Sequence, residues 1–310
     1  MRAAGATWVQ EAPWRPRSRA MRLRGIIRRQ PLGTASGFII LGFVLVALAS
    51  PWMAPHNPHA FVGPSLQAPT RLYPFGTNNL GQDILSRVIY GSQVSLAVGV
   101  SAVLLGTIAG TTLGLLSGYF GGWIDMIIQR ALEIVAAFPG LVLILVVIAA
   151  LGRPHVSAST NIVTLAWQLR VIVIAIAIGF VFAVTRVVRS VTIGQRGSTY
   201  VDAAKSCGAG WQRVIVIHIL PNVVPYIIVG ATAALGFAIL LEAAVSFLGY
   251  GVPPGTPSWG ADLSGPSRQF FLQAPWLALS PGAAISLTLL GFNLLGDSLR
   301  DVLDPRLRGG

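Results

Sequence analysis

The chain has 310 residues, of which 54% are hydrophobic and only 10% are charged. A soluble domain carries about a quarter charged residues, so this composition excludes an ordinary soluble globular protein and indicates a membrane protein. The formal net charge is +12, and the single cysteine, Cys207, excludes an intrachain disulfide framework.

An arginine-rich tail opens the chain. Eight arginines precede the first apolar run: Arg2, Arg15, Arg17, Arg19, Arg22, Arg24, Arg28 and Arg29. Beside a membrane span, such a cluster sets the orientation of the chain and meets anionic lipid. Nucleic acid binding is disfavoured, because no aromatic stacking platform accompanies the charges. Arg28-Arg29 could imitate a cleaved twin-arginine signal, but five more spans follow, which favours an uncleaved first span.

Six apolar runs of 17 or more residues predict six transmembrane helices and an all-α membrane protein. The runs are Ser36–Met53, Val94–Leu116, Val135–Leu151, Val171–Val188, Val223–Leu241 and Leu277–Leu295. We expect helices because lipid cannot satisfy the open edge of a sheet. The chain then divides into a tail (1–35), a first span (36–53), an outer loop (54–93), a core (94–298) and a C-terminal tail (299–310).

The distribution of Arg and Lys predicts the orientation of the spans. With the N-terminus in the cytoplasm, 17 of the 22 basic residues fall on the inner side and five on the outer side. Because positive residues concentrate in cytoplasmic segments, we expect both termini inside.

The second span contains a row of glycines spaced four residues apart: Gly106, Gly110, Gly114 and Gly118, with Gly122 following. Such a row forms a smooth ridge that a neighbouring helix can approach closely. Static packing explains the pattern. A surface along which helices shift during transport is the alternative.

The sequence offers no enzyme site. G-x-S-x-G and H-E-x-x-H are absent, and His56 and His59 are too few ligands for a metal site. The only lysine, Lys205, follows Ala204 rather than the glycine that a P-loop requires. Energised transport would therefore draw on an ion gradient or on another subunit.

Three acidic residues lie in or beside the spans. Glu242 is a membrane carboxylate in the extended fifth span, and such a group lines a translocation path or makes a structural hydrogen bond. Asp125 and Glu133 flank the inner end of the third span, where we expect them to cap the helix or pair with Arg130.

A polar stretch, residues 200–221, interrupts the membrane pattern between the fourth and fifth spans. Its residues predict a helix over Tyr200–Ser206, a sharp turn at Gly208 and Gly210, and a second helix over Trp211–Leu220. Pro221 marks the entry into the fifth span. Such a helical hairpin could act as a lever on both spans, and an inert connection is the alternative.

The hairpin resembles the coupling loop of permease subunits in ATP-binding-cassette (ABC) importers, E-A-A-x3-G-x9-I-x-L-P. The fixed positions of this pattern are occupied by Asp202, Ala203, Ala204, Gly208, Leu220 and Pro221, and the resemblance implies that Trp211 and His218 also belong to the coupling loop. In that family the loop docks into a groove of the cytoplasmic ATPase. Asp202 replaces the usual Glu, and His218 replaces the usual Ile.

The likeness extends over nearly the whole chain and is most similar to the C-type permease of dipeptide and oligopeptide importers. It includes "PFGTNNLGQDILSRVIYGSQVSL" (74–96), "AFPGL" (137–141), "LEAAVSFLGYGVPPGTPSWG" (241–260) and "FNLLGDSLRDVLDPRLR" (292–308). Asn78 and Gln82 replace the Asp and Arg that are more common in the first of these segments, which leaves any charge pairing there in doubt.

This resemblance implies a type I ABC importer permease in a bacterial cytoplasmic membrane. It implies a B-type permease partner, two ATPase subunits that would bind ATP and Mg²⁺, and an extracytoplasmic solute-binding protein. Closely similar permeases carry nickel chelates or glutathione, so the cargo stays open. An ion-coupled secondary transporter is the alternative from another class. It would predict broken helices and carboxylates near mid-bilayer.

Overall fold

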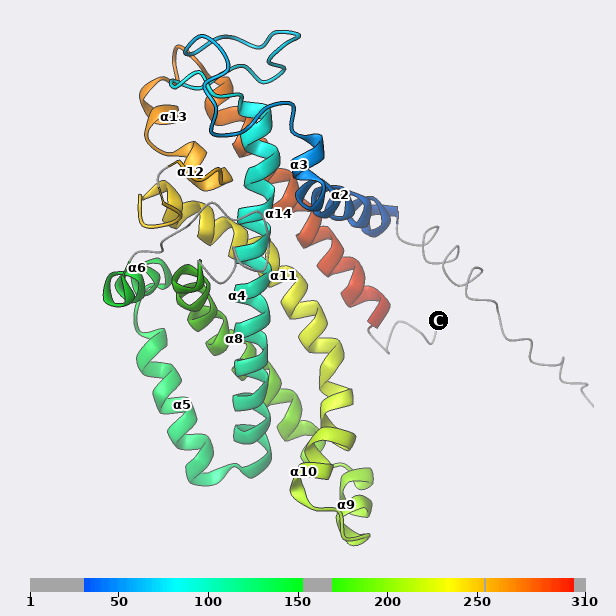
Figure 1. Cartoon of the computed structure of the whole chain (residues 1–310). Coiled ribbons are helices and arrows are strands. Elements are labelled where there is room, and N and C mark those ends of the chain that lie inside the picture. Colours follow the sequence, from blue (N-terminus) through cyan, green and yellow to red (C-terminus); the bar gives the residue numbers. More distant parts are fainter. Residues whose placement is uncertain (1–30, 153–168, 254, 304–310) are drawn as a thin grey trace, which may run out of the picture.

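The computed structural model describes residues 31–152, 169–253 and 255–303, which form a helical protein (Figure 1). Among these residues no strand forms, and one isolated β-bridge joins Thr77 to Asp83. The arginines of the N-terminal tail, as well as Arg306 and Arg308, lie outside the described residues. The predicted all-α class is confirmed.

Five of the described helices are long and apolar enough to cross a membrane. They are α2 (Pro31–Leu48), α4 (Ile84–Phe120), α8 (Arg170–Arg196), α11 (Leu220–Phe247) and α14 (Trp276–Leu303). The last four extend beyond the predicted apolar runs at both ends, because a helix continues into the polar zone where hydropathy no longer marks it. The first span starts at Pro31 and gives way at Ala49 to a short helix, α3 (Ser50–Met53).

The third span differs from the prediction of one helix over Val135–Leu151. Two helices, α5 (Gly122–Ala136) and α6 (Gly140–Leu151), meet there at 92°, and a sixth span exists only if this pair is counted as one. Pro139 causes the break, since it has no backbone N–H and disfavours helical geometry at Phe138. The run contains no polar residue at this point, so hydropathy alone could not show the break.

α4 is the central helix, and Figure 1 shows it extending along most of the molecule. Its N-cap, Asp83, accepts hydrogen bonds from the amide of Ser86 at 3.1 Å and from the hydroxyl of the same residue at 2.6 Å. These bonds satisfy an amide that the first helical turn leaves free. The helix ends at Gly121, whose φ of +65° is strained for any residue with a Cβ.

The glycine ridge of α4 is covered by α8. A Cβ added at Gly110 would lie 2.8 Å from Cβ of Val184, and one added at Gly114 would lie 2.7 Å from Cβ of Val188. Both separations are shorter than real Cβ contacts, so the glycines permit the close approach of the two helices. The structure supports the packing interpretation of the glycine row.

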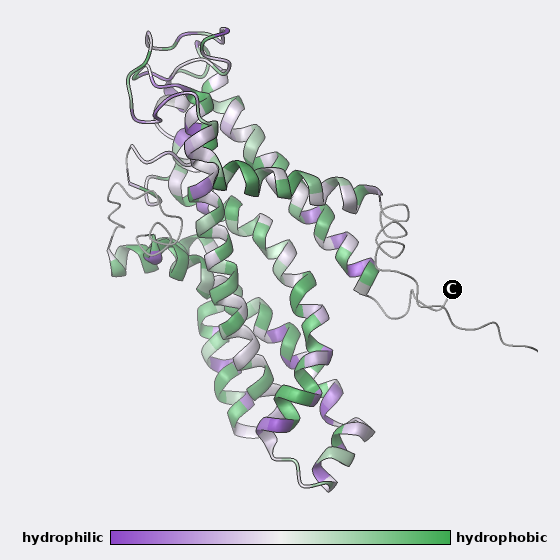
Figure 2. Cartoon of the chain, turned by 45° about the vertical axis from the view of Figure 1, so that its right-hand side comes forward, coloured by the Kyte–Doolittle hydropathy of each residue, from purple (hydrophilic) through white to green (hydrophobic). Residues whose placement is uncertain are grey.

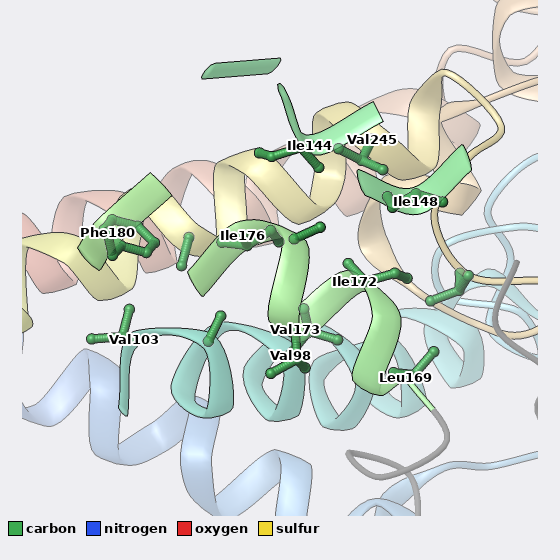
Figure 3. Packing of buried hydrophobic residues seen from close by; sticks show 14 of the residues in the cluster. Val98, Val103, Ile144, Ile148, Leu169, Ile172, Val173, Ile176, Phe180 and Val245 are labelled. Carbon is green, nitrogen blue, oxygen red and sulfur yellow. The ribbon is translucent and has the colours of Figure 1, made fainter. Parts of the chain in front are cut away.

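The largest apolar cluster joins α4, α6, α8 and α11, and Figure 3 shows it from close by. Ile144 and Ile148 of α6 pack in it with Ile172 and Ile176 of α8 and with Val245 of α11. In a membrane, such packing stabilises through dispersion and close fit, because lipid tails are as apolar as the side chains.

The two ends of the molecule are built differently. One end is the cap, which consists of residues 54–83 and 248–275 and includes α12 (Trp259–Leu263) and α13 (Pro266–Gln269). The opposite end carries the hairpin, residues 200–221 (Figure 1). Figure 2 shows hydrophobic residues along the helices between them and polar residues gathered toward the ends.

Candidate functional site

The first arm of the hairpin is α9 (Thr199–Ser206), which is closed by a glycine. Gly208 has φ +80°, a conformation that glycine adopts without strain. Its amide donates to the carbonyl of Lys205 at 2.9 Å, and the amide of Ala209 donates to the carbonyl of Ala204 at 3.0 Å. These two bonds form a Schellman helix end. The predicted turn at Gly208 is therefore confirmed.

The second arm runs into the membrane-spanning helix without a break. α10 (Trp211–Arg213) continues as a π-helical stretch, η1 (Val214–Ile219), and α11 follows at Leu220. The predicted boundary between a separate second helix and the fifth span is wrong. Pro221 has no backbone N–H to donate to the preceding turn, and the π-helical stretch ends at Ile219, two residues before it. The wider π turn before it is a feature that often accompanies functional sites.

An apolar cluster fixes the hairpin to the helix ends behind it. Val201 of α9 is fully buried in a cluster with Leu115 of α4 and Val188 of α8. Phe120, the last residue of α4, meets the ring of Trp211 edge to face at 5.4 Å. The hairpin is therefore packed against α4 and α8 as well as joined to α11.

Side-chain hydrogen bonds hold the two arms of the hairpin together where the arms meet α8 and α11. The hydroxyl of Tyr200 donates to Oε1 of Gln195 at 2.7 Å. Nδ2 of Asn222 donates to the hydroxyl of Tyr200 at 3.1 Å and to the carbonyl of His218 at 2.8 Å. These bonds connect the end of α8, both arms and the start of α11, so the hairpin is held as one unit.

The predicted hairpin residues differ in exposure. Asp202, Ala203, Gly208, Trp211 and Pro221 are exposed, whereas Ala204, His218 and Leu220 are half-buried. Nζ of Lys205 lies 3.4 Å from Oδ1 of Asp202, so one exposed ion pair marks the tip. The exposed tip of the hairpin thus presents the charges of Asp202 and Lys205, the ring of Trp211 and the small residues Ala203 and Gly208.

Glu242 lies in α11 toward the cap, and its side chain is completely buried. The carboxylate accepts hydrogen bonds from the hydroxyls of Ser95 and Ser246, both at 2.8 Å. The first bond joins α4 to α11 inside the chain. Of the two interpretations of Glu242, this geometry favours the structural hydrogen bond.

The cap is held by an arginine that sequence reasoning did not single out. Nε and Nη2 of Arg87 donate to Oδ1 of Asp262 at 2.9 and 2.5 Å. Nη1 donates to Oε1 of Gln82 at 3.1 Å and to the carbonyls of Pro58 and Gly255 at 3.3 and 3.4 Å. Arg87 therefore joins both segments of the cap to α4.

A cavity of about 390 Å³ opens beside the Arg87–Asp262 pair. Nδ2 of Asn78 donates there to Oε1 of Gln82 at 2.8 Å. The two residues that depart from the more common pattern thus meet each other as a neutral amide pair.

The two histidines of the outer loop belong to the cap. Nδ1 of His56 lies 3.4 Å from Oδ2 of Asp83. Burial, together with the charge of Arg87, lowers the pKa of His59. Within the described part of the chain, no group of three or more His, Cys, Asp or Glu could hold a metal ion.

The acidic residues near the hairpin end pair differently from one another. Glu133 accepts from Arg130 at 3.0 Å, as predicted. Asp125 instead accepts two bonds from Arg189 of α8, both at 2.6 Å. Because these partners are 64 positions apart, local spacing could not reveal the pair.

Several helices long and apolar enough to cross a membrane, with a folded cap at one end and a polar hairpin at the other, define a multi-pass membrane protein. Residues 110–309 match the family described as binding-protein-dependent transport system inner membrane component. Residues 20–74 match the N-terminal transmembrane domain of oligopeptide transport permease C. The chain belongs to this family of multi-pass permease components of ABC transporters, which are not enzymes.

Several characterised permeases are similar in sequence to this chain over almost its whole length. The dipeptide transport system permease protein DppC of Alkalihalophilus pseudofirmus is 41% identical over 299 residues, which cover 96% of this chain and 91% of that protein. The glutathione transport system permease protein GsiD is 38% identical in Pectobacterium atrosepticum, over 90% of this chain and 89% of that protein. GsiD of Escherichia coli O157:H7 is 40% identical, with 91% and 89% covered. The resemblance drawn from the sequence motifs is confirmed.

Proposed function

We propose that the chain is one permease subunit of an ATP-driven importer and forms half of the path for dipeptides and oligopeptides. A B-type permease would supply the other half, two ATPase subunits would bind ATP and Mg²⁺, and a solute-binding protein would deliver the peptide. Both termini and the hairpin would then face the cytoplasm. The name of the DppC relative supports the peptide cargo.

The observation that carries the proposal is the mechanical continuity of the hairpin. Its exposed tip at Asp202 stands on α9, whose Val201 is buried against helices α4 and α8, and its second arm passes into α11. An ATPase that closes against the tip would move the inner ends of these helices together. ATP hydrolysis in the partner would thereby change access to the solute path.

Charge reversal at the tip tests this coupling. Asp202→Arg should abolish peptide uptake and peptide-stimulated ATP hydrolysis in the assembled complex, because it reverses the charge presented to the ATPase. Asp202→Glu keeps the charge and serves as the matched control, with uptake near that of the parent. Normal uptake by the Arg variant, at equal amounts of complex in the membrane, would refute the coupling role.

Glutathione is the second candidate cargo, because two of the relatives described above carry it in their names. Glutathione is itself a tripeptide, so the same path could accept either solute. Uptake of labelled dialanine and of labelled glutathione by the same vesicles, with the cognate solute-binding protein, separates the two.

A further inference from the structure

Two backbone breaks separate α5 from the helices before and after it. At its start, Gly121 and Gly122 have φ of +65° and +56°, a region that residues with a Cβ rarely adopt. At its end, the chain turns by 92° at Ala137–Pro139 into α6. α5 is therefore not a straight continuation of either neighbour, and its side chains decide where it lies against the rest of the described chain.

One carboxylate provides most of the polar contact between α5 and its neighbours. Along α5, which the structure describes in full, only Leu132 is buried. Arg189 of α8 donates Nε to Oδ1 and Nη2 to Oδ2 of Asp125, both at 2.6 Å. Oδ1 also accepts from the hydroxyl of Ser117 in α4, and Nε2 of Gln129 donates to that hydroxyl at 3.2 Å. The Asp125 side chain thus joins α5 to both α4 and α8.

The Asp125–Arg189 pair is suited to hold two helices in a fixed orientation. The planar guanidinium engages both carboxylate oxygens, and such a two-point pair fixes direction as well as distance. The side chains of Asp125 and Arg189 are 18% and 33% exposed, so solvent screens their attraction only in part. The pair between Arg130 and Glu133 of α5 is 77% and 48% exposed and joins no second helix. It provides a natural comparison on the same element.

The partners of this carboxylate lie directly beside the anchor of the hairpin. Arg189 follows Val188, which is buried in the apolar cluster that holds Val201 of the hairpin. Ser117 lies two residues after Leu115, which belongs to the same cluster. Figure 1 shows the start of α5 at the end of the molecule that carries the hairpin. The hairpin and α5 are therefore attached to the same turns of α4 and α8.

We propose that Asp125 is a positioning residue of the transport cycle, whose pair with Arg189 makes α5 move with α8 when the partner ATPase displaces the hairpin. The proposal rests on the proposed function, because the ATPase supplies the force. Without the pair, α8 would follow the hairpin while α5 stayed behind, and ATP would be hydrolysed with less solute transported.

A comparison of ATP hydrolysis with uptake tests this role in the complete complex, reconstituted in vesicles with the solute-binding protein and trialanine. Asp125→Asn removes the charge of the pair, and Glu133→Gln, which removes the charge of the exposed pair on the same helix, is the matched control. Asp125→Asn should lower trialanine uptake roughly fivefold or more while stimulated ATP hydrolysis stays within about twofold of the parent. Glu133→Gln should change neither activity. If uptake and hydrolysis of Asp125→Asn fall in the same proportion, or neither falls, the proposal is wrong.

A distance between spin labels reports on α5 directly. In a Cys207→Ala parent, Ile134→Cys in α5 and Ile193→Cys in α8 carry the labels, because both isoleucines are exposed. The distance should be the same without nucleotide and with ATP trapped by vanadate, and it should differ between these states once Asp125→Asn is added. A distance that already changes in the parent would overturn the proposal, and this measurement needs no substitution at Asp125.

The outcomes separate this proposal from the proposed function. If the parent imports neither trialanine nor glutathione but the label distance depends on Asp125 as expected, the positioning role stands and the peptide cargo is wrong. If the parent imports trialanine and Asp125→Asn leaves both uptake and the label distance unchanged, the cargo stands and the positioning role is wrong.

Discussion

Arg87 and Asp262, 175 positions apart in the sequence, form the ion pair that holds the cap together. Their side chains are only 8% and 15% exposed. Arg87 is in the first turns of the central helix, and Asp262 is in α12, so the pair fixes a loop-rich region to the central helix. The two irregular segments of the cap, residues 54–83 and 248–275, are thereby held in one fixed arrangement.

Removing one partner of this pair should destabilise the protein strongly. Arg87→Leu leaves the Asp262 carboxylate buried without a cation, and the free energy of unfolding should fall by roughly 3 kcal/mol. Thermal unfolding of the purified chain in detergent, followed by tryptophan fluorescence, measures the loss. Trp259 is fully buried in α12 and reports on the cap directly.

The double variant Arg87→Leu with Asp262→Leu is the control for this experiment. It removes both charges, so most of the stability lost in the single variant should return. If the double variant is as unstable as Arg87→Leu alone, the packing of the arginine stem rather than the ion pair holds the cap.

The helices of this protein could be predicted because lipid imposes a simple pattern on them. Apolar length identified the positions of α4, α8, α11 and α14, and the glycine at position 208 identified the hairpin turn. The break at Pro139 was missed, since an apolar run shows hydropathy and not backbone geometry. The motif "AFPGL" did carry the signal, in the form of a proline between two helical segments.

The polar contacts between distant segments could not be predicted. Asp125 has Arg130 nearby in the sequence but binds Arg189, because the fold places α8 beside the start of α5. Arg87 and Asp262 share no motif or spacing that a single sequence could reveal. Such pairs depend on tertiary packing, which local periodicity does not encode.

The glycine ridge of α4 should tolerate no added side chain. Gly114→Ala places a methyl group 2.7 Å from Cβ of Val188, and the strain should cost about 1–3 kcal/mol of stability. Gly179→Ala, in α8, is the control, because a Cβ there meets nothing within 4 Å. That variant should be neutral or more stable by up to about 1 kcal/mol, since alanine favours a helix. Equal stability of the two variants would contradict close packing of the ridge.

Glu242 should act through its hydrogen bonds rather than through its charge. Glu242→Gln keeps one acceptor oxygen and places an amide N–H₂ at the other position, where a serine hydroxyl can accept, so both contacts can persist and peptide uptake should stay near that of the parent. Glu242→Leu leaves both buried hydroxyls without their partner and should cost about 1–3 kcal/mol of stability. Uptake by reconstituted vesicles and thermal unfolding measure the two effects. A stable Gln variant that no longer transports would instead place the carboxylate in the solute path.

The orientation of the chain can be tested at its two ends. Cys207 is exposed at the hairpin turn, and Leu272 is 95% exposed in the cap. A membrane-impermeant maleimide added to intact spheroplasts should leave Cys207 unmodified, because the hairpin is expected in the cytoplasm. The same reagent should modify the double variant Cys207→Ala with Leu272→Cys.

Inverted membrane vesicles should reverse this result, since they expose the cytoplasmic face to the reagent. Cys207 should then react, and the cysteine at position 272 should be protected. Modification of Cys207 in intact spheroplasts would overturn the predicted topology. It would also exclude contact between the hairpin and a cytoplasmic ATPase, because the two would lie on opposite sides of the membrane.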